Sequence, residues 1–212
     1  MRALGLKDRK FWDNIADKYF AQPVADEEVY QTKLKMTQTH LKPHMRVFEF
    51  GCGTGTTALK HAPFVQSVLA TDLAENMLAY GRSEAERTGI QNVEFLCTSI
   101  EEYDPKGDLF DVVLALNILH LCRDPQAVMK KAHDMLKPGG LLIQSTACIG
   151  NMNPFLRMAI PVAQMVGKAP YVNVMKRDEL HQHIDTAGFH ITERWVPDKS
   201  DVEFIIARRA LD

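Results

Sequence analysis

The feature that most constrains this chain is a glycine-rich loop, GCGTG at residues 51–55, directly after the apolar run RVFEF at 46–50. Glycine costs backbone entropy and contributes no side-chain packing, so three glycines in five positions indicate that something must approach the backbone closely. The next residues, TTALKHA (56–62), are typical of a short helix that Pro63 ends. We therefore expect a strand, a bare turn and a helix, with a ligand at the turn.

Segments typical of strands and helices alternate from residue 46 onward. After the first strand we expect strands at 67–72, 92–97, 110–116 and 141–147. Longer helices are expected at 74–89 and at 124–140, the latter with Asp124 as N-cap. Unbroken apolar strands separated by helices predict an α/β fold whose parallel sheet is covered on both faces, and right-handed crossovers make that sheet doubly wound.

The pattern changes near the C-terminus. HITERWVP (190–197) and VEFIIARR (202–209) are separated by a turn too short for a crossover helix. This pair is predicted to form an antiparallel hairpin, so that one strand of a seven-stranded, mostly parallel sheet runs against the others.

We expect one domain over residues 1–212. Its parts are an N-terminal helical cap (1–45), a cofactor-binding core (46–147), an apolar insert (148–175), and a C-terminal helix with the hairpin (176–212). The three prolines between residues 149 and 172 are expected to break the insert into short pieces.

Composition disfavours several classes of protein. A net charge of −2 gives no basic excess of the kind that nucleic-acid-binding domains carry, so no nucleic-acid partner is expected. No CxxC pair occurs, and no metal site is expected; the cysteines are Cys52, Cys97, Cys122 and Cys148. The N-terminus has no signal-peptide core and no apolar stretch approaches a membrane span, so we expect a cytoplasmic protein without stable membrane insertion.

Two common glycine-loop ligands fit poorly. A dinucleotide fingerprint, GxGxxG, would place its third glycine where this chain has Thr56, and the Gly-Lys-Ser/Thr of a phosphate loop is absent. Glu49 lies two residues before the loop. A carboxylate there would repel a pyrophosphate and suits a cationic ligand.

Four segments, in this order and spacing, resemble the class I S-adenosylmethionine-dependent methyltransferases. They are VFEFGCGTG (47–55), VLATDLAENML (68–78), FDVVLALNILHLCRDP (110–125) and MLKPGGLLIQS (135–145). The resemblance covers residues 46–147 and implies a Rossmann-like fold with a reversed last strand. It also implies S-adenosylmethionine as cofactor and S-adenosylhomocysteine as product.

The resemblance implies a role for several residues. The loop residues Gly51, Cys52, Gly53 and Gly55 would contact the methionine part of the cofactor, and Glu49 its ammonium or sulfonium end. Asp72 would accept hydrogen bonds from the ribose hydroxyls, although a helix N-cap is an alternative role.

The adenine and the acceptor would meet residues after the later strands. Leu73 and Met77 would flank the adenine, and the backbone N–H of Ile100 would serve it. Ser99 stands where many relatives have an aspartate. Asn117 follows the fourth strand, where the sulfonium and the acceptor should meet.

The segment KFWDNIADKYF (10–20) resembles the first helix of ubiquinone- and menaquinone-type C-methyltransferases and of small phospholipid or natural-product methyltransferases. In that setting Tyr19 would cover the cofactor carboxylate and Trp12 would line the acceptor side. The alternative is an amphipathic helix that packs these rings on the core, which we favour for Trp12.

Methyl transfer from a sulfonium needs alignment and exclusion of water, and needs a base only if the acceptor must lose a proton. His120 is the candidate base, and the alternative is a structural histidine. His181 and His183 are two apart on a predicted helix, so joint metal binding is not expected. The sequence NILH stands where methyltransferases of exocyclic amines have Asn/Asp-Pro-Pro-Tyr/Phe, which disfavours that reaction.

The apolar insert favours a lipophilic small-molecule acceptor, for which it would form a lid, with Arg157 and Lys168 available to an acidic group. Core packing, a homodimer contact and a membrane-surface role are the alternatives. The predicted function is in-line methyl transfer to a small, largely apolar metabolite. A non-catalytic cofactor-binding subunit is the alternative, and a nicotinamide oxidoreductase is disfavoured by Thr56 and the reversed strand.

Overall fold

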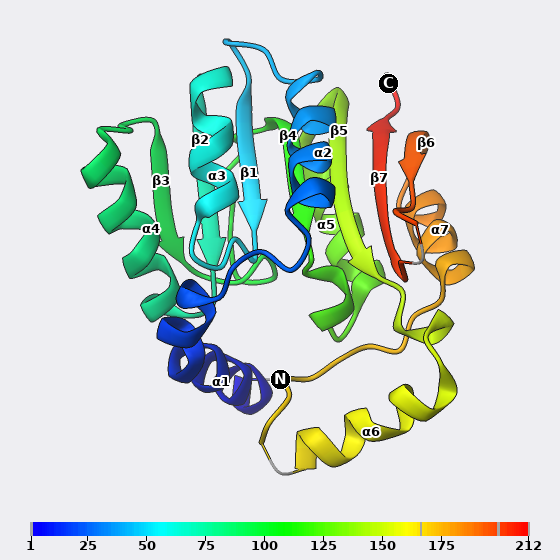
Figure 1. Cartoon of the computed structure of the whole chain (residues 1–212). Coiled ribbons are helices and arrows are strands. Elements are labelled where there is room, and N and C mark those ends of the chain that lie inside the picture. The colour runs from blue at the N-terminus through cyan, green and yellow to red at the C-terminus, as the bar shows by residue number, and fades with distance from the viewer. Residues whose placement is uncertain (1, 166, 199, 212) are drawn as a thin grey trace. The chain divides into compact units, whose positions relative to one another are not determined.

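Within the residues that the computed structural model describes (2–165, 167–198 and 200–211), seven strands form one mixed sheet in the order β3-β2-β1-β4-β5-β7-β6 (Figure 1). The strands are β1 (Arg46–Phe50), β2 (Ser67–Asp72), β3 (Val93–Cys97), β4 (Phe110–Leu116), β5 (Leu136–Ala147), β6 (Phe189–Trp195) and β7 (Val202–Arg209). Helices flank this sheet, and β7 runs antiparallel. The predicted Rossmann-like, doubly wound fold is confirmed.

The chain divides into two compact units, Met1–Leu114 and Ala115–Asp212. In the first unit β1 pairs in parallel with β2 and β4, and β2 with β3. The helical segments here are α1 (Arg2–Ala21), α2 (Glu27–Gln38), α3 (Thr56–His61), the 3-10 helix η1 (Ala62–Phe64) and α4 (Glu75–Thr88). Val47, Phe48 and Phe50 of β1 are almost fully buried, which explains why this strand is largely apolar.

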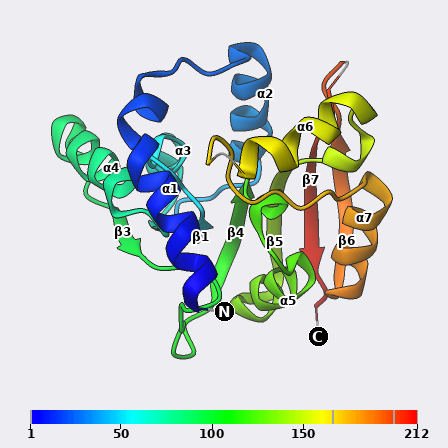
Figure 2. The same ribbon diagram turned by 90° about the horizontal axis from the view of Figure 1, so that it is seen from below.

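Helix α1 lies beside α4, as Figure 2 shows in blue and green. Asp13 accepts a hydrogen bond from the Asn76 backbone N–H at 2.9 Å, and the Tyr80 hydroxyl donates to Asp17 at 2.7 Å. Ala74 stands at the N-cap position of α4, and its methyl side chain cannot accept a hydrogen bond from the first N–H groups of the helix. Helix α1 therefore supplies the cap that α4 lacks. Trp12 packs against the buried cluster beneath, as its packing alternative predicts.

In the second unit β7 pairs antiparallel with both β5 and β6, which confirms the predicted hairpin. The helical segments are η2 (Leu119–Leu121), α5 (Pro125–Met135), η3 (Ile149–Asn151), α6 (Pro154–Met165) and α7 (Arg177–Thr186). Helix α5 packs on β5 and α7 on β6. Asp124 caps α5 by accepting a hydrogen bond from the Ala127 N–H at 2.9 Å, as predicted.

Two of the predictions about helices are wrong. The helix expected at 124–140 ends at Met135, because Leu136 is already extended and the following Pro138 and Gly139 do not continue a helix. The insert is not broken into short pieces throughout, since α6 continues through Pro161 for 12 residues. Pro161 has no main-chain N–H to donate, which costs α6 one hydrogen bond, but it does not end the helix.

The buried histidine of α3 predicts acid sensitivity. The His61 side chain is fully buried, and neither ring nitrogen has a hydrogen-bond partner in the described part of the chain; burial lowers its pKa from 6.5 to about 4. The unfolded chain therefore binds more protons between these two values, so stability falls as the pH drops from 6.5 to 4. We expect this one residue to cost roughly 3 kcal/mol of unfolding free energy at pH 4.

Urea denaturation of the wild type and His61→Leu, at steps between pH 4 and 7, measures this slope. The leucine variant should lose part of it, whereas His44→Leu, at an exposed position, should keep the full slope. Equal slopes for wild type and His61→Leu would contradict the assignment.

Candidate functional site

The glycine loop after β1 is a left-handed turn. Gly51, Gly53 and Gly55 have φ values of 62°, 56° and 71°, a region that favours glycine. The Cys52 N–H donates to the Thr71 carbonyl at 3.0 Å, and the Gly55 N–H donates to the Cys52 carbonyl at 3.0 Å. The loop is thus held against the end of β2 with its backbone in a fixed shape.

Two of these glycines serve different purposes. A Cβ added at Gly55 would lie 2.4 Å from the Phe95 ring, so Gly55 makes room for packing between α3 and β3. A Cβ added at Gly53 would meet only Tyr19, at 3.7 Å, within the described residues. Gly53 therefore presents bare backbone at a place that protein atoms do not fill, as a ligand cradle requires.

Asp72, the last residue of β2, faces this loop. One carboxylate oxygen accepts a hydrogen bond from the Gly53 N–H and the other from the Ala74 N–H, both at 2.9 Å. Burial raises the pKa of Asp72, and these hydrogen bonds oppose that rise. Each oxygen keeps a further lone pair for a hydroxyl donor. The bond to Ala74 shows that Asp72 supports the start of α4, and its role toward ribose hydroxyls stays a prediction.

Glu49 is the most unusual group in the first unit. Its side chain is 2% exposed, and its Oε2 has no hydrogen-bond partner in the part of the chain that the structure describes. Burial, with a smaller contribution from Asp72, raises the pKa of Glu49 to about 8. A buried carboxylate without a partner is costly, and a cation beside it would relieve that cost.

The other side chains around the loop are neutral. Burial raises the pKa of the Cys52 thiol well above its usual value, and Glu49 and Asp72 add to this. Tyr19 lies over Gly53, is about half exposed, and packs edge-on against Trp12 with the ring centroids 6.2 Å apart. The Tyr30 hydroxyl lies 3.2 Å from the hydroxyl of Thr57. Its proximity to this region was not predicted, because no sequence pattern places α2 beside α3.

The predicted adenine contacts fall into two groups. The Thr98 N–H donates to the Asp72 carbonyl at 3.0 Å, which brings the end of β3 beside Asp72. Leu73 is half-buried, and the Ser99 hydroxyl accepts from the Glu102 N–H at 3.2 Å, so Ser99 also closes a local turn. Met77, however, is 1% exposed within a core cluster, and the Ile100 side chain is 3% exposed. The structure places Met77 in the core and leaves Leu73 and Ser99 accessible.

In the second unit, Asn117 takes the left-handed conformation at φ 57° just after β4. Its N–H donates to the Ser145 carbonyl at 2.7 Å, and the Ser145 hydroxyl donates to the Asn117 side-chain oxygen at 3.3 Å. Asparagine tolerates this conformation better than most residues. Non-glycine residues held at positive φ are concentrated at functional sites, so Asn117 stays a candidate.

His120 lies in η2, three residues further on. Burial lowers its pKa to about 4, and its buried Nδ1 has no hydrogen-bond partner among the described residues. The ring is therefore neutral at physiological pH. An uncharged ring with an unpartnered nitrogen can accept a hydrogen bond or a proton from a ligand.

Two other histidines, both on α7, have separate hydrogen-bond partners. His181 contacts Glu203 and His183 contacts Gln126, so the two rings point to different partners.

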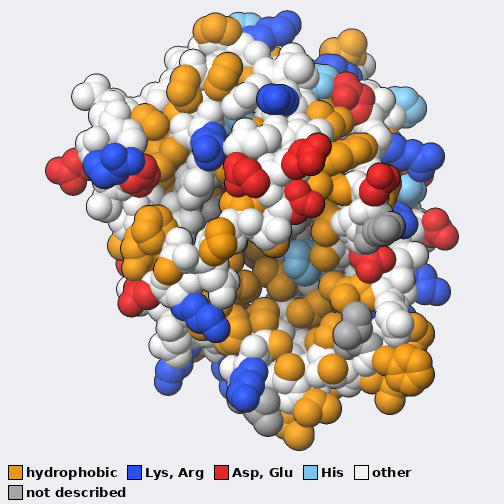
Figure 3. Space-filling model, viewed as in Figure 1, with side chains coloured by type: hydrophobic (Ala, Val, Ile, Leu, Met, Phe, Trp, Pro, Cys, Tyr) orange, Lys and Arg blue, Asp and Glu red, His pale blue; other side chains and the backbone are white. Residues whose placement is uncertain are grey.

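In the apolar insert, the Arg157 side chain donates a hydrogen bond to the Gly150 carbonyl at 3.1 Å, within the insert itself. Helix α6 exposes four large apolar side chains that recur at helical spacing, on a part of the surface that Figure 3 shows along its lower edge: Phe155, Met158, Val162 and Met165. No described helix is long and apolar enough to cross a membrane.

Comparison with known sequences finds similarity to methyltransferases. A family model described as a methyltransferase domain matches residues 47–140. Ubiquinone biosynthesis O-methyltransferases of Ruegeria pomeroyi and Dinoroseobacter shibae are 32% and 31% identical over 157 residues. The match covers 71% of this chain and 62% of each relative, so the chain spans less than two thirds of the length of these relatives.

Solved structures share the fold. The N-methyltransferase NodS from Bradyrhizobium japonicum, in complex with S-adenosylhomocysteine, has a TM-score of 0.70 at 16% identity, with 93% of this chain and 98% of that chain covered. A putative methyltransferase from Bacillus halodurans has a TM-score of 0.71 at 20% identity, with 84% and 98% covered.

Proposed function

Because the chain belongs to the class I S-adenosylmethionine-dependent methyltransferases, we propose that it transfers the methyl group of S-adenosylmethionine to a small, largely apolar acceptor. The observation that carries this proposal is the buried Glu49 carboxylate, whose Oε2 has no hydrogen-bond partner among the described residues, beside a loop of bare backbone. That pairing suits a ligand that has both a cationic group and polar groups that can contact the main chain.

The residues of the first unit fit the cofactor. Glu49 would neutralise its ammonium group, and the open backbone at Gly53, under Tyr19, would receive its methionine part. Asp72 would accept hydrogen bonds from the ribose hydroxyls with its remaining lone pairs. Leu73 and Ser99 would lie toward the adenine, with the Met77 side chain supporting them from the core.

When bound, S-adenosylmethionine supplies a methyl group already activated by its positive sulfur, so the chain's own residues mainly align the acceptor. We propose that the acceptor atom is a hydroxyl oxygen, which the names of the O-methyltransferase relatives support. The oxygen gains the methyl group and loses its proton. His120 Nδ1, unpartnered and on a neutral ring, would take that proton.

Helix α6 would supply apolar contacts to the acceptor. Its exposed side chains include two methionines, which adapt their shape to irregular ligands. Arg157 is already bonded to the Gly150 carbonyl, so Lys168 is the better candidate for an acidic group on the acceptor.

The experiment that tests this function measures proton release. Glu49 has a pKa of about 8 in the ligand-free chain, so below pH 8 it must lose a proton before it can pair with the cofactor ammonium. We expect the affinity for S-adenosylhomocysteine to fall about tenfold for each pH unit between 7.5 and 5.5. Isothermal titration at pH 7 in phosphate and in Tris should show nearly one proton released per site.

The matched control is Glu49→Gln, which keeps the shape of the side chain and removes its titration. This variant should bind more weakly at pH 7.5, release no proton, and show little dependence on pH. The proposed role of Glu49 is wrong if wild type and variant release protons equally, and the proposed function is wrong if the wild type binds neither S-adenosylmethionine nor S-adenosylhomocysteine.

A further inference from the structure

The segment 170–175, which we call the strap, joins α6 to α7 without regular structure and lies along the loop that carries His120. The Asn173 N–H donates to the His120 carbonyl at 2.7 Å, and its side-chain amide lies 3.5 Å from the Cys122 carbonyl. The Arg123 guanidinium lies 4.2 Å from the centroid of the Tyr171 ring. The strap therefore contacts this loop at three residues, His120, Cys122 and Arg123.

Both ends of the strap are fixed. At its start the Gln164 side chain donates to the Pro170 carbonyl at 2.9 Å. At its end the Gly150 N–H donates to the Met175 carbonyl at 2.9 Å. A Cβ added at Gly150 would lie 3.0 Å from backbone atoms of Met175 and Lys176, so the absence of a side chain at Gly150 permits this approach.

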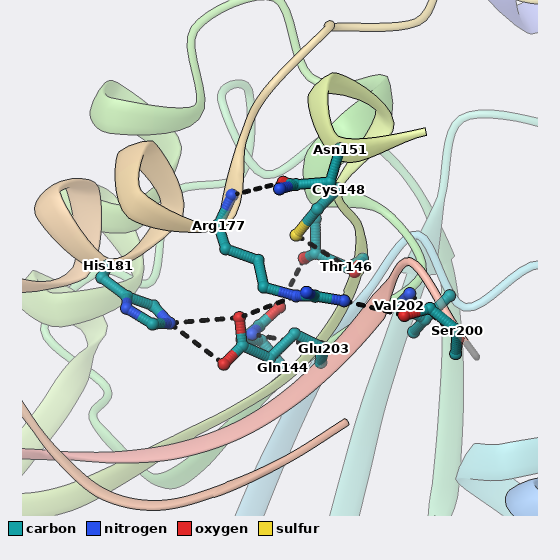
Figure 4. Close-up of polar contacts among 9 residues, drawn as sticks. All are labelled: Gln144, Thr146, Cys148, Asn151, Arg177, His181, Ser200, Val202 and Glu203. Carbon is teal, nitrogen blue, oxygen red and sulfur yellow. Dashed lines mark hydrogen bonds and ion pairs between the residues drawn. The ribbon is translucent and has the colours of Figure 1, made fainter. Parts of the chain in front are cut away.

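Beyond the strap, a buried polar cluster holds the first turn of α7 (Figure 4). The Glu203 carboxylate, 1% exposed, lies 3.0 Å from His181 Nε2 and 3.9 Å from Arg177 Nε. Arg177 also donates to the Ser200 carbonyl at 2.7 Å, and its backbone N–H donates to the Asn151 side chain at 3.0 Å. Because Arg177 follows the strap by two residues, this cluster anchors it.

We propose that the strap is a positioning element for His120, in which Asn173 holds the His120 loop and the Arg177–Glu203 pair anchors the strap. This inference rests on the proposed role of His120 in methyl transfer. Asn173 and Arg177 are positioning residues, since their contacts are with the loop and with β7.

The hydrogen bonds at both ends of the His120 loop show how the strap could hold it. The loop from Asn117 to Arg123 is tied to β5 at its start, through the Asn117 N–H and the Ser145 carbonyl, and to the strap from His120 onward. The described contacts of η2 include no side-chain hydrogen bond that fixes the His120 Nδ1. In the proposal, the backbone bond from Asn173 helps to fix the His120 loop, and small displacements of a catalytic group cost large factors in rate.

The test follows the His120 ring by NMR, through its Cε1–Hε1 signal between pH 5 and 8. Asn173→Pro removes the N–H that bonds to His120, and Gly150→Ala pushes on the end of the strap. Val174→Pro is the matched control, because Val174 is 49% exposed and the described residues give its N–H no hydrogen bond.

In the wild type and in Val174→Pro, the signal should keep the neutral-ring position down to pH 5, since burial holds the His120 pKa at about 4. In Asn173→Pro and Gly150→Ala, the ring should gain solvent and titrate within this range, with a pKa raised by about one unit or more. If Asn173→Pro does not fold, the His120 titration in Gly150→Ala alone tests the proposal.

An unchanged His120 titration in a folded Asn173→Pro or Gly150→Ala protein would overturn the proposal. Titration of S-adenosylhomocysteine separates this failure from a failure of the proposed function. All three variants should bind it as the wild type does, because none of the three substituted residues is among those assigned to the cofactor. Normal binding with an unchanged His120 would reject the strap alone.

Discussion

Gly53→Arg should abolish binding of S-adenosylmethionine and S-adenosylhomocysteine. A Cβ at Gly53 points into space bordered only by Tyr19 among the described residues, so the arginine side chain would occupy the volume assigned to the cofactor. Its positive charge would also pair with Glu49 and Asp72 in place of the cofactor ammonium. We expect the dissociation constant to rise by at least about a thousandfold, equivalent to roughly 4 kcal/mol.

Gly107→Arg is the matched control for this change. Gly107 also has a positive φ, 88°, and a Cβ there would meet no atom within 4 Å, so backbone strain and added charge are comparable. The control should bind S-adenosylhomocysteine as the wild type does by isothermal titration. If Gly53→Arg folds and binds normally, the loop is not the cofactor cradle.

His120→Gln should lower the rate of methyl transfer to a phenolic or catecholic acceptor about a hundredfold or more, the usual contribution of a positioned base. Glutamine keeps a similar size and can still form hydrogen bonds, but it cannot take a proton at neutral pH. Because the His120 pKa is about 4, the wild-type ring is neutral at every pH above about 5. The rate should therefore not fall between pH 8 and 6 through protonation of this base.

The measurement is kcat against a panel of small hydroxyl acceptors, with transfer of labelled methyl as readout. S-adenosylhomocysteine binding should be unchanged in His120→Gln, which separates a chemical defect from a structural one. His190→Gln, at an exposed position in β6, should leave the rate intact. Equal rates for wild type and His120→Gln would remove His120 from the mechanism.

The first part of the site could be predicted because it follows from backbone chemistry. Glycines between an apolar strand and a helix indicate a bare turn, and an aspartate at the end of the next parallel strand must lie at the same edge of the sheet. The structure places Asp72 in hydrogen-bond contact with Gly53. The seven strands and the reversed hairpin followed equally from apolar runs and from a connection too short for a helix.

What sequence could not provide are contacts between segments far apart in the chain. Gly55 has a packing role because Phe95, forty residues later, occupies its Cβ position. Asp13 caps α4 from another helix, and no capping motif within α4 announces it. Met77 has the spacing of a residue beside the loop, but its side chain turns into the core with Ala16.

The strap was missed for a similar reason. Its segment contains no periodic pattern and was assigned to the apolar insert, whereas its contacts to His120 and Gly150 are main-chain hydrogen bonds that almost any sequence can form. The isolated Gly150 was a signal that another backbone approaches there, although sequence alone does not identify which one. The burial of Glu49 could be anticipated from its strand, but the lack of a partner for its Oε2 among the described residues could not.

The glycine loop can be tested as the cofactor site by titrating the ¹⁵N-labelled chain with S-adenosylhomocysteine and following its backbone amide signals. We expect saturable shifts, at ligand concentrations up to about 1 mM, for Gly51, Gly53 and Gly55 and for the residues around Asp72, with Gly89 and Gly107 unchanged. Unmoved loop glycines at saturation, or shifts confined to other parts of the chain, would show that this loop does not bind the cofactor.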